Sequence, residues 1–515
     1  MTKKLPLGLQ DFRKIRLHDF KYVDKTRYLY EMAAAPSAYF LSRPRRFGKS
    51  LTLSTLAELF SGSRELFEGL WIADKWDWEK RYPVIRISFS LIGFKELGLE
   101  SAIVQQLHTI GERHGIRLVK SGIAPMLYEL LEKLATNAKV VLLIDEYDAP
   151  LTNYLSIDQE MAIHNREILK DFYSALKEAD HLLHFVLLTG VSRFSKVGIF
   201  SGLNNLRDIS SNKNYATMLG YTQEELENNF DTEIADAAQR MGIGRGELLN
   251  KVQFWYNGYR FEENAPKVYN PVSINLFLED QKFENFWFET GTPTLLINML
   301  KEKGLYHFSL EPVSEYAFSS FEVEDINLYG LLYQTGYLTI VRRDEYGLYH
   351  LDYPNHEVKS SMVAYLMEAF SGVPKASGDA LAVRMMLAFE ADDLEQVMGI
   401  LRGLFAGIPY QLYESVPERF FHASIHLLFS LVGMRIQSEV CTSDGRADSV
   451  VETAKRVYIL EYKLDESPET ALSQIRDKAY FRPWFGRGKP VTGIGVSFSS
   501  EKRNIAGWKA AELMP

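Results

Sequence analysis

A short basic segment, residues 43–50, contains the residue types that bind phosphate groups. Its last residues are Gly48, Lys49 and Ser50. In a phosphate-binding loop, backbone N–H groups and a lysine contact the phosphates while a hydroxyl helps to hold Mg²⁺. The usual spacing places a first glycine at position 43, where this chain has Arg43. The segment is therefore either a variant phosphate loop with added positive charge or a basic surface turn.

A continuous apolar run, Val140 to Ile144, ends in two acidic residues, Asp145 and Glu146. Such a run is typical of a strand covered on both faces, and ligands of parallel sheets bind where the strands end. We expect Asp145 to hold Mg²⁺ together with Ser50, and Glu146 to orient and deprotonate the attacking water. Asp148 is a less favoured substitute for either acid. An acidic cluster here can also be a solvated turn, but the upstream loop favours the functional interpretation.

The apolar run Phe185 to Leu188 leads into a polar segment, Thr189 to Arg193. A polar side chain at this strand end can sense the terminal phosphate. Arg193 either stabilises the charge that develops in the transition state or pairs with a neighbouring carboxylate, and the sequence favours neither role.

A second set of chemical groups lies near the C-terminus, at Asp448, Glu461 and Lys463. Residues 461 and 463 are two apart on an expected strand, so their side chains leave by the same face. Hairpin pairing brings Asp448 alongside, and two carboxylates with a lysine can hold Mg²⁺ and steady the water at a scissile phosphate. A lone Glu-x-Lys is common on exposed strands. Glu418 and Glu439 are expected to complete the metal shell, and Gln474 and Tyr480 either to orient Lys463 or to contact the phosphate.

Between residues 38 and 190 short apolar strands alternate with amphipathic helices, which predicts an α/β fold with a parallel sheet. The expected strands are 38–41, 84–89, 140–144 and 185–188, and the expected helices are 51–60, 102–113, 126–134 and 160–177. Beyond about residue 220 the pattern is mainly helical, beginning with a helix capped by Thr222. The aromatic residues between 254 and 288 predict a core at a domain junction, and residues 371–378 are the candidate linker.

After about residue 416 the expected order is a helix, three strands, a helix and a closing strand. The expected strands are 435–440, 447–452, 457–462 and 493–498, and the expected helices are 418–431 and 469–481.

Length and composition limit the possible architecture and cellular environment of this chain. Its 515 residues are enough for several domains with filled cores. Its only cysteine, Cys441, excludes an intramolecular disulfide and a thiolate zinc cluster, and indicates a reducing, cytoplasmic environment. We expect neither a signal peptide nor a membrane span. The formal net charge of -9 argues against a surface that is basic all over. A basic segment, residues 476–503, is either a local nucleic-acid site or a solvated face.

Together these motifs resemble a known family, the bacterial and archaeal AAA-ATPase-like proteins that carry a C-terminal PD-(D/E)XK nuclease-like domain. The resemblance covers nearly the whole chain, and members of that family commonly lack the first glycine of the loop. It rests on Tyr22 to Thr26, Ser42 to Leu51, Asp145 to Asp148, Thr189 to Arg193, Phe200 to Leu206, Trp255 to Tyr259, Tyr269 to Pro271 and Tyr353 to Asn355.

The resemblance implies a phosphate-loop ATPase domain over residues 1–220, a mainly helical middle region over 221–375 and a nuclease-like α/β domain of restriction-endonuclease type over 376–515. We expect ATP and Mg²⁺ as cofactors and DNA or RNA as the partner of the C-terminal domain. The residues expected to contact nucleotide are Arg45, Arg46, Phe47, Gly48, Lys49, Ser50 and Leu51. The alternatives are a nucleotide-dependent switch with an inactive nuclease-like domain, and a nuclease with a vestigial phosphate loop.

Overall fold

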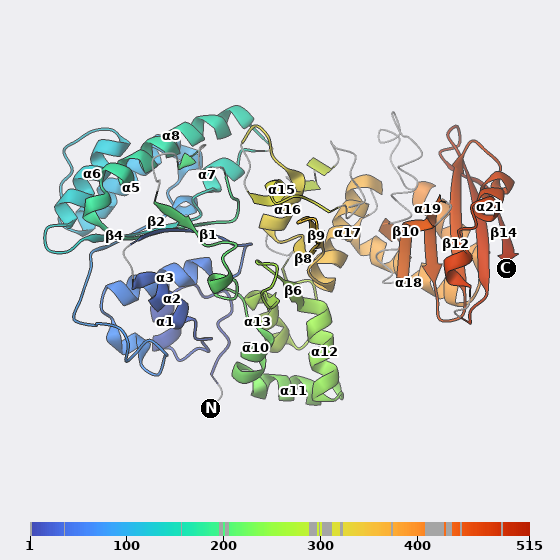
Figure 1. Cartoon of the computed structure of the whole chain (residues 1–515), viewed down its shortest axis with the longest axis horizontal. Helices are drawn as coiled ribbons and strands as arrows, with labels where there is room; N and C mark the ends of the chain where they lie inside the picture. The colour runs from blue at the N-terminus through green and yellow to red at the C-terminus, as the bar shows by residue number, and fades with distance from the viewer. Residues whose placement is uncertain are drawn as a thin grey trace. The chain divides into compact units, whose positions relative to one another are not determined.

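The computed structural model describes the chain except for a set of short segments. These are residues 1–2, 35–36, 156, 195–198, 201–204, 288–295, 298, 301–311, 320–322, 372–373, 407–426, 429–434, 443–444, 486–487 and 515. The described chain forms two compact units (Figure 1), of which the first comprises residues 1–295 and 310–358 and the second comprises residues 296–309 and 359–515. The division into three parts at residues 220 and 375 stays a prediction.

The first unit contains a five-stranded parallel sheet in the order β2-β3-β4-β1-β5. Its strands are β1 Ser37–Ser42, β2 Val84–Ser88, β3 Val140–Asp145, β4 Leu183–Gly190 and β5 Leu206–Asp208. The residues of β3 up to Ile144 are fully buried, which explains why this run carries no polar alternation. The four strands expected from the apolar runs are present. The fifth, β5, was missed because three residues give too little pattern to detect.

Helices cover both faces of this sheet, with α5, α6 and α8 on one side and α1, α2 and α3 on the other (Figure 1). Their bounds are α1 Phe12–Leu17, α2 Thr26–Ala33, α3 Lys49–Phe60, α5 Leu99–Arg113, α6 Ile123–Leu134 and α8 Gln159–Glu178. The helical spacing in the sequence predicted α3, α5, α6 and α8 correctly. Because all five strands run in parallel, their carboxyl ends meet at one edge, and the motifs lie there.

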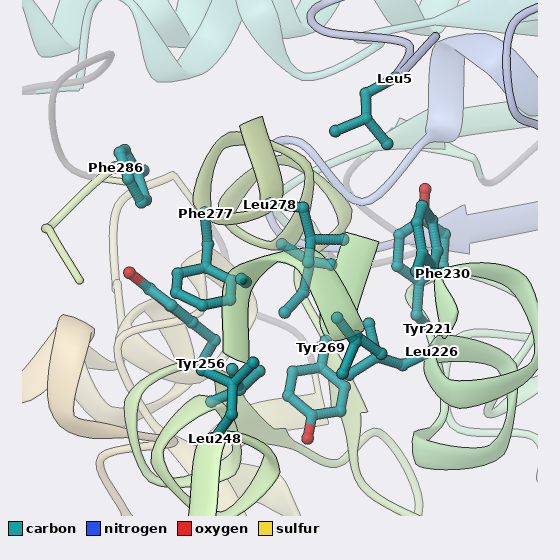
Figure 2. Close-up of a cluster of buried hydrophobic side chains, with 14 of the residues drawn as sticks. Leu5, Tyr221, Leu226, Phe230, Leu248, Tyr256, Tyr269, Phe277, Leu278 and Phe286 are labelled. Carbon is teal, nitrogen blue, oxygen red and sulfur yellow. The ribbon is translucent and has the colours of Figure 1, made fainter. Parts of the chain in front are cut away.

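The middle of the chain is mainly helical, as expected, but it also contains two small hairpins. Its helices are α10 Gln223–Asn229, α11 Asp231–Met241, α12 Arg245–Tyr256, α13 Pro271–Asp280 and α16 Leu328–Thr335, and its strand pairs are β6 Asn257–Tyr259 with β7 Val268–Tyr269 and β8 Thr339–Arg343 with β9 Tyr349–Asp352. Thr222 and Glu225 form the expected capping box at α10. Aromatic and aliphatic side chains of this region pack with Leu5 into one core (Figure 2).

The second unit is built on a mixed five-stranded sheet in the order β10-β11-β12-β13-β14. The strands are β10 Arg435–Thr442, β11 Gly445–Glu452, β12 Val457–Leu464, β13 Val491–Ser499 and β14 Asn504–Leu513. The helices are α18 Lys375–Glu390, α19 Leu394–Ala406, α21 Pro468–Asp477 and the part of α17 His356–Ser371 that follows residue 358. Only β12 and β13 pair in parallel. The expectation that β13 closes the unit was wrong, because the half-exposed β14 pairs with it as an edge strand.

The expected linker at residues 371–378 was also placed wrongly. α17 ends at Ser371, and α18 begins at Lys375 directly after Pro374. A proline has a fixed φ that suits the start of a helix, so these turn-forming residues separate two helices rather than form a long loop. The expected helix 418–431 lies almost wholly outside the described residues.

Candidate functional site

The basic segment forms a loop between β1 and the first turn of α3. Gly48 has φ +97° in the left-handed region, and α3 starts at Lys49. A residue with a Cβ is strained in that conformation. Lys49, Ser50 and Leu51 therefore lie at a helix N-terminus, where free N–H groups and the helix dipole favour an anion.

The side chain of Lys49 folds back onto its own loop. Its Nζ donates to the carbonyl oxygens of Arg43 at 2.8 Å and Pro44 at 2.9 Å. Burial lowers the pKa of Lys49 to about 8, although Asp145 and Asp148 act in the opposite direction. Both acceptors are neutral, so the ammonium charge is solvated by dipoles and not cancelled by a carboxylate at contact distance. Such a lysine is suited to an anionic ligand.

Arg43, which occupies the place of the usual glycine, is a structural residue and does not face the ligand. Only 1% of it is exposed. Its guanidinium donates to the carbonyl oxygens of Ser42 at 2.8 Å, Ser210 at 2.6 Å and Tyr215 at 3.1 Å, and lies 4.1 Å from the ring centre of Phe261. Arg43 thus fixes the start of the loop through contacts with the protein interior. Of the other expected loop residues, Arg45 is exposed, Arg46 is half-buried and Phe47 is buried.

Asp145 and Glu146 lie at the end of β3 and, with Ser50, line one cleft of about 460 Å³. Both carboxylic residues are half-buried. Asp145 Oδ1 accepts a hydrogen bond from the hydroxyl of Thr189 at 2.7 Å, which orients the carboxylate. Glu146 has φ +51°, an uncommon conformation for a residue other than glycine. The structure thus brings together the hydroxyl and the two acids that the sequence proposed as a metal and water site.

Asp148 is not an alternative metal ligand in this arrangement. It is buried, and its Oδ2 accepts the backbone N–H groups of Val191 at 3.1 Å and Ser192 at 2.7 Å. Burial raises the pKa of Asp148, and the hydrogen bond from Ser192 acts against this rise. A Cβ on Gly190 would lie 2.6 Å from Asp148 Oδ1, so glycine is required for this close approach. Asp148 ties the ends of β3 and β4 together.

Arg193 forms an ion pair in the structure. Its Nη2 lies 2.7 Å from Asp208 Oδ2, and its Nη1 donates to Ser211 at 3.1 Å. Its backbone N–H donates to Gln334 Oε1 at 2.7 Å. The ion pair corresponds to the second role expected for Arg193, pairing with a neighbouring carboxylate. It holds the guanidinium beside Ser42 and Arg43, where the loop starts.

A smaller cavity of about 80 Å³ borders the other side of the loop, at Phe47, Gly48, Leu51 and Thr52. Its remaining walls are mostly apolar. They come from three further segments: Pro6 to Leu29, Met218 to Tyr221, and Pro271. The cavity does not follow from local sequence patterns, because segments far apart in the chain form it; the motif at Tyr22 to Thr26 contributes part of its wall.

The C-terminal carboxylates and lysine also meet, on β11 and β12. Asp448 Oδ2 accepts the backbone N–H of Tyr462 at 2.8 Å, and Lys463 Nζ lies 3.5 Å from Glu461 Oε1. Glu461 is 1% exposed. Burial, and then the charge of Asp448, raise the pKa of Glu461. The alternation of side chains along β12 places Glu461 and Lys463 on one face, as the spacing predicted.

The chemistry of this site fits a divalent cation. Glu461 Oε2 is buried and has no hydrogen-bond partner within the described part of the chain. A cation between Asp448 and Glu461 would satisfy that oxygen and offset the repulsion between the two carboxylates. Among the described ranges no cluster of three or more His, Cys, Asp and Glu side chains is placed to hold a metal. Mg²⁺ commonly takes one or two carboxylates and completes its shell with water and substrate phosphate.

Gln474 on α21 orients Glu461. Its Nε2 donates to Glu461 Oε1 and, at 3.2 Å, to the hydroxyl of Tyr480. The expectation that Gln474 orients Lys463 or contacts the phosphate stays a prediction; in the structure the acceptor of Gln474 is the buried acid Glu461. The other two supporting residues are not placed: Glu418 lies outside the described residues, and for Glu439 the structure describes only the backbone.

Part of the basic segment 476–503 follows the residues of this site along the chain. Arg476, Lys478 and Arg482 are exposed and follow Gln474 directly along the chain. Lys489, in contrast, forms an ion pair with Glu452 at 2.9 Å. Lys463 is thus the cation in contact with Glu461, and the end of α21 and the residues after it add exposed positive charge.

Comparison with known proteins assigns both halves of the chain. Residues 6–200 match a family model described as a predicted AAA-ATPase, and residues 416–508 match one described as the PD-(D/E)XK nuclease superfamily. The chain is also 38% identical, over an alignment of 531 residues, to a protein of Azotobacter chroococcum mcd 1 named "Uncharacterized protein in vnfD 5'region". That alignment covers 99% of each chain.

Proposed function

We propose a function for this chain from its membership of the family of predicted AAA-ATPases that carry a PD-(D/E)XK nuclease superfamily domain. It binds and hydrolyses ATP, and it couples this cycle to cleavage of nucleic acid by its C-terminal domain. The observation that carries the proposal is the convergence of Lys49, Ser50, Asp145 and Glu146 on the carboxyl edge of one parallel sheet. This convergence is a feature of the fold and does not rely on similarity to other proteins.

At the first site, the N-terminus of α3 provides N–H groups for the phosphates. Lys49 would exchange its two carbonyl partners for phosphate oxygens, a small movement because both acceptors belong to the same loop. Ser50 and Asp145 would hold Mg²⁺, which supplies charge neutralisation at the terminal phosphate when bound. Glu146 would accept the proton of the attacking water.

The small apolar cavity beside Gly48 is the place we propose for the nucleobase. It is adjacent to the loop, and its walls come from the N-terminal segment and from Met218 to Tyr221. A flat apolar ring suits such walls, whereas the phosphates require the polar N-terminus of α3. Binding of the base would therefore connect the N-terminal segment to the region that follows β5.

At the second site, Asp448 and Glu461 would hold Mg²⁺ beside the scissile phosphate. Bound metal would polarise that phosphate, and Lys463 would stabilise the developing charge or position the water. Gln474 fixes Glu461. The exposed Arg476, Lys478 and Arg482 provide positive charge for a DNA or RNA backbone.

The proposal is tested by separating the two activities with two substitutions. Glu146→Gln should keep ATP binding, measured by calorimetry, and lose phosphate release. Asp448→Asn should keep ATP turnover and lose cleavage of single-stranded, duplex or structured DNA and RNA in Mg²⁺ or Mn²⁺. Absence of any cleavage by the unaltered protein over this panel would rule out the nuclease half, and failure to bind ATP would rule out the nucleotide half.

A nucleotide-dependent switch that cleaves nothing is the second candidate. The pairing of Arg193 with Asp208 favours it, because the guanidinium of Arg193 is then engaged and does not stabilise the transition state. This candidate predicts ATP binding with negligible turnover, and stimulation of turnover by nucleic acid would count against it.

A cytoplasmic location completes the proposal. The single cysteine excludes stabilisation by an intramolecular disulfide. Among the described helices none has both the length and the apolar character needed to cross a bilayer.

A further inference from the structure

The outer surface of the phosphate loop is covered by residues from the middle of the chain. Phe47 is buried against the rings of Tyr259 and Phe261, at centroid distances of 4.9 and 5.3 Å. On the other side of the loop, Pro44 lies against Gly336, where an added Cβ would come within 2.8 Å of the proline ring. The conformation of the loop therefore depends on residues some 200 or more positions further along the chain.

One buried carboxylate, Glu357, connects the groups that reach the loop backbone. It accepts hydrogen bonds from the Trp287 N–H at 2.7 Å and the Ser273 hydroxyl at 2.9 Å. The indole of Trp287 lies 3.5 Å from the carbonyl oxygen of Arg45. Asn270, which caps the helix that contains Ser273, approaches the same oxygen at 3.4 Å. Both contacts are at the long end of the range for hydrogen bonds.

The next residue of the loop, Arg46, brings a positive charge into the field of Glu357. Arg46 has φ +69°, in the left-handed region, and its charge stabilises the ionised form of Glu357. A bound triphosphate would attract the same guanidinium.

We propose that Glu357 is a positioning residue of the nucleotide site, which holds the phosphate loop through Trp287 and α13 and makes triphosphate affinity depend on the charge of its carboxylate. The inference rests on the proposed binding of ATP to the loop. It assigns a role in nucleotide binding to a residue that lies far from the phosphate-loop motif in sequence and outside both matched family segments.

The surroundings of Glu357 determine the direction of the effect. Burial raises the pKa of Glu357 to about 7, against the hydrogen bonds from Trp287 and Ser273 and the charge of Arg46. On the neighbouring elements, Tyr256 and Tyr259 stay neutral because burial raises their pKa. His356, the preceding residue, stacks on the exposed ring of Phe254.

Bound phosphates add negative charge near Glu357 and attract the guanidinium of Arg46 away from its carboxylate. Both effects raise the pKa of Glu357 further. Nucleotide binding then takes up a proton. Affinity is highest below pH 7, and the contribution of Glu357 decreases as the pH rises through that value, by at most about tenfold per pH unit. Lys49, whose pKa burial lowers to about 8, adds a decrease at higher pH that the unaltered protein and Glu357→Gln share.

The experiment is calorimetric titration of the full-length protein with MgATP between pH 6 and 8.5, in buffers that differ in ionisation enthalpy. The unaltered protein should take up a fraction of a proton near pH 7. Glu357→Gln carries no charge; its amide oxygen can accept from the Trp287 N–H at the place of Oε1, and its NH2 group, at the place of Oε2, can donate to the Ser273 hydroxyl oxygen. It should bind like the unaltered protein at pH 6, several-fold more tightly at pH 8, and with less proton uptake.

Glu129→Gln is the matched control, because it removes the charge of another buried carboxylate, which holds the backbone of Val119 and Lys120. It should leave the pH profile of binding unchanged. If Glu357→Gln does not fold, Ser273→Ala provides the same test, since loss of one donor to the carboxylate should move the profile to higher pH. Identical pH profiles for the unaltered protein and Glu357→Gln would overturn the inference, whereas absence of ATP binding at every pH would overturn the proposed function itself.

Discussion

The two candidate sites differ in how the charge of their lysine is balanced. Lys49 contacts two neutral carbonyl oxygens, whereas Lys463 lies 3.5 Å from the carboxylate of Glu461. The ammonium of Lys49 is therefore not paired with a carboxylate at contact distance and can contact an anionic ligand, although burial lowers its pKa to about 8. At the second site two carboxylates exceed one ammonium, so the ionised set has a net negative charge and suits a cation. Similar residue types thus form an anion site in one unit and a metal site in the other.

The largest effect should come from removing the lysine that has neutral partners. Lys49→Met should weaken MgATP binding by about 2–5 kcal/mol, since it leaves the phosphate charge without its buried partner. Lys463→Met is the matched variant and should leave ATP affinity unchanged, with calorimetry as the measurement. Equal losses in both variants would show that the two lysines do not serve separate sites.

The second prediction concerns the negative site. Glu461→Gln should reduce metal-dependent cleavage and Mn²⁺ affinity by at least about 100-fold, because it removes a ligand oxygen, while Gln474→Ala should cost about 10–100-fold because it only orients that ligand. Titration with Mn²⁺ and cleavage assays provide the measurements. Glu466→Gln, which changes an exposed acid nearby, should behave like the unaltered protein. A larger loss for Gln474→Ala than for Glu461→Gln would contradict this order.

The third prediction tests the packing that distinguishes the first site. Phe47→Ala should lower the free energy of unfolding of the first unit by about 3–5 kcal/mol, the usual cost of emptying a buried aromatic position. Phe254→Ala removes an aromatic ring that is 63% exposed and should cost much less. Denaturant unfolding monitored by fluorescence compares the two variants. A stability loss at Phe47 no larger than at Phe254 would mean that the aromatic contacts do not anchor the loop.

The smallest effect on turnover should come from Arg193. Because its guanidinium is paired with Asp208, Arg193→Ala should reduce ATP turnover by less than about tenfold, far below the effect of about 10³-fold or more expected for an arginine that stabilises the transition state. Phosphate-release rates at saturating ATP decide between these values, with Arg207→Ala, a neighbouring arginine on β5, as a control. A decrease of 10³-fold would assign Arg193 to catalysis after rearrangement.

Local sequence patterns were sufficient to predict most of the helices and strands and the order of the candidate groups. Apolar runs without alternation identified the parallel strands, because a strand buried on both faces needs no polar side chain. The spacing of Glu461 and Lys463 placed both on one face of β12, since side chains alternate along a strand. The loop, β3 and β12 therefore lie where local patterns placed them. β5 and β14 did not follow from such patterns, because one is very short and the other is a half-exposed edge strand.

Which side chain each charged group contacts depends on the tertiary structure. Arg43 was expected only as a departure from a motif, but burial against Ser210 and Phe261 makes it a structural residue. Asp148 and Gln474 likewise have partners that lie on other elements. Glu357 shows the same limit, since its proximity to the phosphate loop depends on how distant segments fold together. Hydrogen bonds and charges act over a few ångströms in space, and sequence separation does not reveal that distance.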